Sequence, residues 1–255
     1  MPRMRTVRPL VARLAVLARR HPPLLYATSL FGWIVLLGLQ APQPALLCLS
    51  PSSFASAAAG GLEAMLTVNP LWLLVLSWLV MLLAMMPPLL AQPLAQLQDI
   101  EPDGRRARAM AMFVVGYGAI WLAAGAALAA MAMALGIGAG AMAWPAFAIA
   151  LLIALAWQAT LFKQFCLNRC HRRPRLSAAC LHADALRYGV THGLWCVGAC
   201  WALMLLPLLA GSAHLVVMAA VTVALLVERA RPARPARWGL PLPAFAKPGM
   251  MRSSA

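Results

Sequence analysis

Long apolar stretches that alternate with basic segments are the feature that most limits what this chain can fold into. Lysine and arginine are absent from residues 21–104, 109–162 and 188–228, and each of these intervals is rich in apolar residues. A helix needs about 20 apolar residues to cross roughly 30 Å of hydrocarbon. The pattern therefore predicts an all-α fold, a polytopic bundle of transmembrane helices.

The composition supports a membrane protein over a soluble one. Hydrophobic residues make up 63% of the chain and charged residues 11%, whereas soluble domains are about half apolar and about a quarter charged. The net charge of +15 would suit nucleic-acid binding. The basic residues instead flank the apolar stretches, as they do in cytoplasmic loops of membrane proteins. We expect the lipid bilayer, and no nucleic acid, as a partner.

Six spans with both termini in the cytoplasm place all four basic clusters on one side of the membrane. A basic cytoplasmic segment, 1–23, precedes the transmembrane domain, 24–227, and a basic tail, 228–255, follows it and is expected to be disordered. The spans are expected at about residues 24–39, 71–91, 110–135, 142–162, 188–209 and 213–227.

Two adjacent prolines, Pro87 and Pro88, interrupt the second span. Proline removes a helical hydrogen bond, and a break in a membrane helix is tolerated where protein or a cavity satisfies the freed carbonyls. Met81 and Met85 precede the break and share a helix face. They could pack or bind a metal ion. We expect the break to lie beside the cysteines described next.

The fifth span carries His192, Cys196, Cys200 and Met204 at every fourth position, so all four share one helix face. Thiolate and thioether ligands favour Cu(I), while thiolate and imidazole also suit zinc. This pattern predicts a metal site. The alternative is packing, because free cysteine and methionine are ordinary apolar fillers.

Cys166 and Cys170, at the end of the fourth span, are also four residues apart. From a rise of about 1.5 Å per residue, the donors of three spans are expected in the inner half of the bundle. Donors on one helix lie to one side of an ion, so Met204, Met85 or the Cys166–Cys170 pair would have to complete the site. The cost of bare thiolates favours zinc, and the thioethers favour copper; we expect copper, with zinc as the alternative.

The chain resembles a bacterial family of predicted metal-binding integral membrane proteins, a domain of unknown function. Three sequence blocks between residues 71 and 228 and one closing residue carry the resemblance: Trp78 to Pro87, Gln158 to Cys170, His192 to Met204, and Glu228. Where the family has two adjacent cysteines, this chain has Ala199 and Cys200. The resemblance implies a metal site and the bacterial inner (cytoplasmic) membrane.

These observations predict a membrane protein for metal handling or delivery, with a metal-delivery or membrane-complex partner. The alternative is a non-catalytic membrane subunit that anchors a partner protein. We expect no enzyme, because the sequence has no nucleotide-binding loop, no Ser-His-Asp set and no carboxylate pair, and only six acidic residues.

Overall fold

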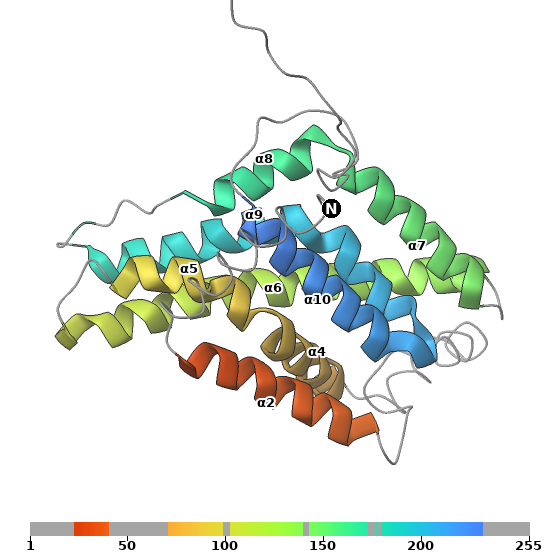
Figure 1. The fold of residues 1–255 in the computed structure, drawn as a ribbon, viewed down its shortest axis with the longest axis horizontal. Coiled ribbons are helices and arrows are strands. Elements are labelled where there is room, and N and C mark those ends of the chain that lie inside the picture. Colours follow the sequence, from red (N-terminus) through yellow and green to blue (C-terminus); the bar gives the residue numbers. More distant parts are fainter. Residues whose placement is uncertain are drawn as a thin grey trace, which may run out of the picture.

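The computed structural model describes residues 23–40, 71–98, 103–139, 143–172, 177 and 180–231. These residues form α-helices and one short 3-10 helix without a strand, which confirms the all-α class. In chain order the elements are α2 (Pro23–Gln40), α4 (Leu71–Met85), α5 (Pro87–Gln98), α6 (Asp103–Ala139), α7 (Ala143–Gln158), α8 (Leu161–Cys170), α9 (Leu181–Leu209), η1 (Gly211–Ala213) and α10 (His214–Ala230) (Figure 1). The expected N-terminal segment, most of the first outer connection and nearly all of the tail lie outside these residues.

Three helical segments of the described chain are long and apolar enough to cross a membrane: Arg105–Leu135, Leu181–Leu209 and Gly211–Ala230. The number rises to five if each of two bent helix pairs forms one span. Helix α2 is apolar but shorter. Every expected span therefore coincides with an apolar helix or helix pair, whereas the number of crossings stays a prediction.

The two bends have different sequence origins. Helices α4 and α5 meet at Met86 with a bend of 69°, next to the proline pair, as predicted. Helices α7 and α8 meet with a bend of 70°, where we expected a continuous span to residue 162. Thr160 lies at this second break, where its backbone is extended and its side chain accepts a hydrogen bond from the Lys163 amide and caps α8.

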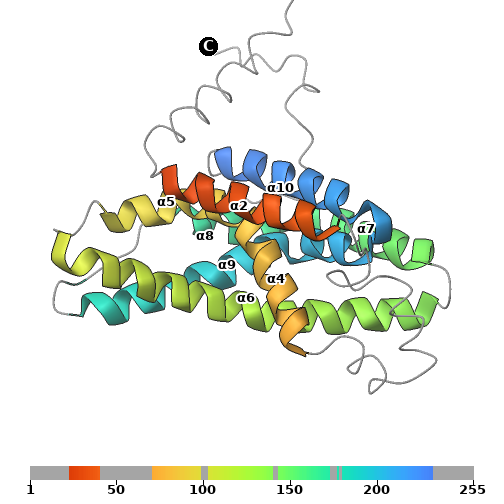
Figure 2. The same ribbon diagram turned by 90° about the horizontal axis from the view of Figure 1, so that it is seen from below.

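Helix α9 is the most buried of the long helices, and α6 runs beside it along one side of the bundle (Figures 1 and 2). Glycines allow their backbones to approach closely. A Cβ atom on Gly116 would lie 2.6 Å from the Leu186 carbonyl oxygen, and one on Gly189 would overlap the Phe113 carbonyl oxygen. Small residues serve the same purpose in other membrane bundles. This contact fixes Tyr117 of α6 relative to the cysteines of α9.

Replacing Gly189 with alanine should destabilise the bundle. The added methyl group meets backbone rather than a movable side chain, and such overpacking costs about 1–3 kcal/mol. Gly118 is a matched control, since a Cβ there has nothing within 4 Å and alanine is the better helix former. Thermal unfolding in detergent should therefore show a lower Tm for Gly189→Ala and an unchanged or higher Tm for Gly118→Ala. Equal Tm values would contradict the close contact.

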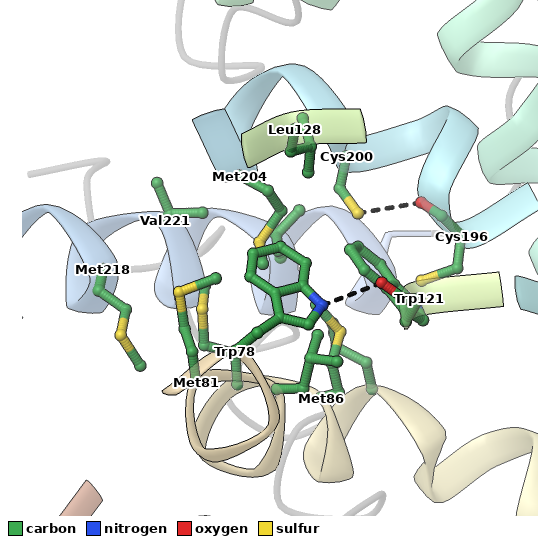
Figure 3. Packing of buried hydrophobic residues seen from close by; sticks show 14 of the residues in the cluster. Trp78, Met81, Met86, Trp121, Leu128, Cys196, Cys200, Met204, Met218 and Val221 are labelled. Atoms are coloured by element: carbon green, nitrogen blue, oxygen red, sulfur yellow. Dashed lines mark hydrogen bonds between the residues drawn. The ribbon is translucent and has the colours of Figure 1, made fainter. Parts of the chain in front are cut away.

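The C-terminal half of α4 is held from two sides. Trp78 Nε1 donates a 2.9 Å hydrogen bond to the Trp121 carbonyl of α6 (Figure 3), and Gly125 leaves room for this indole. On the other side, the Ser29 hydroxyl of α2 donates to the Ala84 carbonyl. These bonds fix the end of α4 in the core, and Met86 follows directly after it.

Candidate metal site

Cys196 is the centre of a buried polar cluster. Its side chain is buried. Its Sγ lies 3.3 Å from the Tyr117 hydroxyl of α6 and accepts a 3.1 Å hydrogen bond from Arg229 Nη2 of α10. One turn further along α9, Cys200 Sγ donates to the Cys196 carbonyl at 2.9 Å. Residues from three helices therefore meet at one thiol.

A methionine joins this cluster from the α4–α5 break. The Tyr117 hydroxyl that contacts Cys196 also donates to Met86 Sδ at 3.4 Å. A thioether and a thiol thus lie within hydrogen-bonding distance of the same phenolic oxygen. The predicted proximity of the proline break to the thiols is observed. Met85, the methionine singled out from the sequence, is fully buried in the same apolar cluster, and Met86 is the one in contact with Tyr117.

The last turn of α10 places the Arg229 guanidinium beside the thiols. Helix α8 and its C-cap residue His171 hold this turn at two points. Lys163 of α8 forms an ion pair with Glu228, and His171 Nε2 bonds the Arg229 carbonyl at 3.2 Å. The Arg229 guanidinium donates to the thiol of Cys196, and its charge also acts on the nearby thiol of Cys170. The two cysteines, on α8 and α9, therefore share one positive charge.

His192 lies one helical turn from Cys196 and is 3% exposed. Three aromatic rings surround its imidazole, with centroids 5.9 Å away for Phe113, 6.1 Å for Tyr117 and 5.7 Å for Tyr188. Its Nε2 is buried and makes no hydrogen bond within the part of the chain that the structure describes. A buried nitrogen without a partner is unfavourable, so a bound ligand would relieve that cost.

The remaining candidates divide into two groups. Met204 is fully buried and belongs to the same apolar cluster as Cys170, Cys196 and Cys200. Cys166 is also buried, but it packs with Leu167 and Ala199 in a separate cluster. Cys166 and Cys170, four residues apart on α8, thus lie in different surroundings, and Cys170 is the one near Arg229.

Sequence reasoning missed Tyr117, Met86 and Arg229. Tyr117 carried no signal, since a tyrosine in an apolar helix is ordinary. Met86 lies in the Trp78–Pro87 block of the family resemblance, but Met85 was chosen from that block. Arg229 did carry a signal. Helix α10 continues to Ala230, so Glu228 and Arg229 are charged residues within a mostly apolar helix, and such residues are functional candidates. Glu228 was noted only as the closing residue of the family resemblance, and the assignment of Arg229 to the tail removed it from consideration.

No group of three or more His, Cys, Asp or Glu side chains in the described residues is arranged to hold a metal ion. The soft donors that do converge include a methionine thioether, and thioether with thiolate is a donor combination that selects Cu(I). The arrangement therefore offers the Cys196 thiol on α9, the Cys170 thiol on α8 and the Met86 thioether at the α4–α5 break.

Comparison with known proteins identifies a family for this chain. A family model described as "PpoB2: Copper chaperone" matches residues 75–245, well over half of the chain. The matched range contains every element from α5 to α10 and most of α4. No curated protein and no solved structure matches the chain.

Proposed function

This chain belongs to the PpoB2 copper chaperone family, and on that premise we propose that it is a membrane-integrated carrier that takes up Cu(I) at Cys196 and passes it to a copper-requiring partner protein. The observation that carries the proposal is the meeting of Cys196 with Tyr117, Met86 and Arg229. Copper is the cargo here and not a fixed cofactor.

Three sulfur atoms from three elements suit this cargo. Cys196 on α9 and Cys170 on α8 supply thiolates when they bind, and Met86 supplies a thioether from the break. An ion between them has donors on more than one side, which the single face of α9 could not give. Cys200 keeps its proton while it bonds the Cys196 carbonyl. We assign His192, Cys200, Met204 and Met85 to the surroundings that receive or release the ion.

The charge of Arg229 supports copper over zinc. Cu(I) with two thiolates carries one negative charge, and the guanidinium beside both thiols neutralises it. Zn(II) with two thiolates is neutral, so the same guanidinium would leave one buried positive charge without compensation. Uncompensated charge in a low-dielectric core is costly. Charge balance and donor softness therefore both favour Cu(I).

Membrane insertion is supported by the outer surface of the bundle. Large apolar side chains project outward from several helices, including Leu30 of α2 at 62% exposed, Trp144 of α7 at 67% and Val216 of α10 at 73%. Soluble monomers rarely expose large contiguous apolar patches. A bilayer would cover these side chains.

Replacing Cys196 with serine tests the proposal. The hydroxyl is a hard donor that does not replace thiolate for Cu(I), so Cys196→Ser should lose the tightly bound ion while the protein stays in the membrane fraction. Cys180→Ser is the matched control, because Cys180 is exposed and lies outside the cluster. Copper content of purified protein, with Cu(I) affinity from chelator competition, measures both.

Two results would refute the proposal. One is stoichiometric copper in Cys196→Ser at wild-type affinity. The other is a wild-type protein that takes up no copper, which would support the alternative of a membrane anchor whose sulfur residues only pack.

A further inference from the structure

The opposite end of α10 presents a second pair of soft donors that the cluster at Cys196 does not use. His214 is the first residue of α10 and is 5% exposed, and Met218, one turn later, is fully buried. Residues four apart lie on one helix face. Fifteen residues at about 1.5 Å each separate His214 from Arg229, so the two ends are roughly 22 Å apart.

Hydrogen bonding determines which nitrogen of the His214 imidazole has a lone pair. Its Nδ1 lies 2.8 Å from the Pro207 carbonyl of α9. A carbonyl oxygen can only accept, so Nδ1 carries the hydrogen, and in the neutral ring Nε2 carries the lone pair. Metal-binding histidines characteristically donate their other N–H to a carbonyl or carboxylate in this way.

His171 provides a contrast within the same chain. Its Nδ1 faces the Leu167 carbonyl at 2.9 Å and its Nε2 faces the Arg229 carbonyl at 3.2 Å. Each ring nitrogen of His171 faces a carbonyl oxygen, so neither nitrogen is open to a metal ion. Nε2 of His214 makes no hydrogen bond to the described residues.

We infer that His214 and Met218 form a second, weaker Cu(I) site at the end of the bundle opposite Cys196, where the ion first enters. The inference rests on the proposed function for the identity of the ion. Buried methionines continue from this pair toward the thiols. Figure 3 shows Met218 and Met81 at the left of the core, Met204 and Cys200 in the centre and Cys196 at the right.

The charge of the pair explains why this site would release its ion. Imidazole and thioether are neutral, so binding Cu(I) there displaces no proton and leaves one positive charge in the core. At Cys196 the thiolates and Arg229 give a neutral assembly. Buried uncompensated charge is unfavourable, so the ion is held more tightly at the thiols and moves toward them. The absence of lysine and arginine from residues 188–228 leaves no basic side chain in this stretch to repel a cation.

The test uses the full-length protein in lipid nanodiscs with Cu(I) alone as the probe. Chelator competition should resolve a second, weaker equivalent in the wild type. His214→Asn should lose it, since the amide can still donate to the Pro207 carbonyl but lacks the second nitrogen. Met218→Leu, a volume-conserving change that cores tolerate, should weaken it. Met112→Leu is the control, because Met112 packs in a different cluster.

A spectroscopic measurement separates this site from the thiols. In a Cys196→Ser background, X-ray absorption should still show imidazole scattering from the bound copper, and the added His214→Asn change should remove it. The inference is wrong if the wild type holds a single Cu(I) that Cys196→Ser eliminates. It is also wrong if His214→Asn and Met218→Leu both retain the weaker equivalent. If Cys196→Ser keeps the tightly bound copper while His214→Asn loses the weaker equivalent, the proposed function is overturned and this site stands.

Discussion

Replacing Lys163 with methionine should lower the free energy of unfolding by about 3–5 kcal/mol, the usual cost of breaking a buried ion pair from one side. The side chains of Lys163 and Glu228 are 4% and 12% exposed, and they pair with each other between α8 and α10. Without Lys163, the Glu228 carboxylate would remain in the core without a counter-charge. The last turn of α10 would lose one of its two attachments to α8.

The double variant Lys163→Met with Glu228→Met separates the two effects. Apolar replacement of both partners of a buried pair is often close to neutral, so the double variant should be more stable than the single one. Arg187→Met on the exposed face of α9 controls for the loss of a basic residue. Denaturant unfolding in detergent gives the three values. A cost for Lys163→Met below about 1 kcal/mol, typical of a surface pair, would contradict a buried location.

The pair also illustrates what the sequence could and could not reveal. The positions of the helices followed from apolar length and from the spacing of basic residues, and the break at Met86 followed from Pro87 and Pro88. Lys163, however, was assigned to a basic cytoplasmic loop. A count of positive charges treats all lysines alike, whereas the structure buries this one against a carboxylate from a helix 65 residues away.

The candidate metal site was also predictable only in part. The helix period placed Cys196 and Cys200 on one face, and depth alone brought the break near them. The choice of Met86 over Met85, and of Cys170 over Cys166, depends on how α5 and α8 turn after their bends. Tertiary contacts, such as the ion pair of Lys163 on α8 with Glu228 on α10, hold these helices after their bends, and no periodicity in one helix encodes them.

Replacing Arg229 with methionine should weaken Cu(I) binding by about 10- to 100-fold. A hydrogen bond to a charged group contributes about 1.5–3 kcal/mol, and each 1.4 kcal/mol changes affinity about tenfold. Arg229 Nη2 lies 3.1 Å from Cys196 Sγ, and the guanidinium charge also acts on Cys170, so both thiolates would lose their counter-charge. Arg229→Lys should lose less, because it keeps the charge but not the forked donor geometry.

Metal preference gives the decisive measurement for Arg229. Without the guanidinium, two thiolates around Cu(I) leave a buried negative charge, while two thiolates around Zn(II) are neutral. Arg229→Met should therefore shift the preference from Cu(I) toward Zn(II), measured by competition between the two ions for the purified protein. A simple loss of folding would lower both affinities together, so it cannot produce that shift. An unchanged preference with both affinities intact would mean that Arg229 does not balance the charge of the site, and the argument for copper would then rest on the sulfur donors alone.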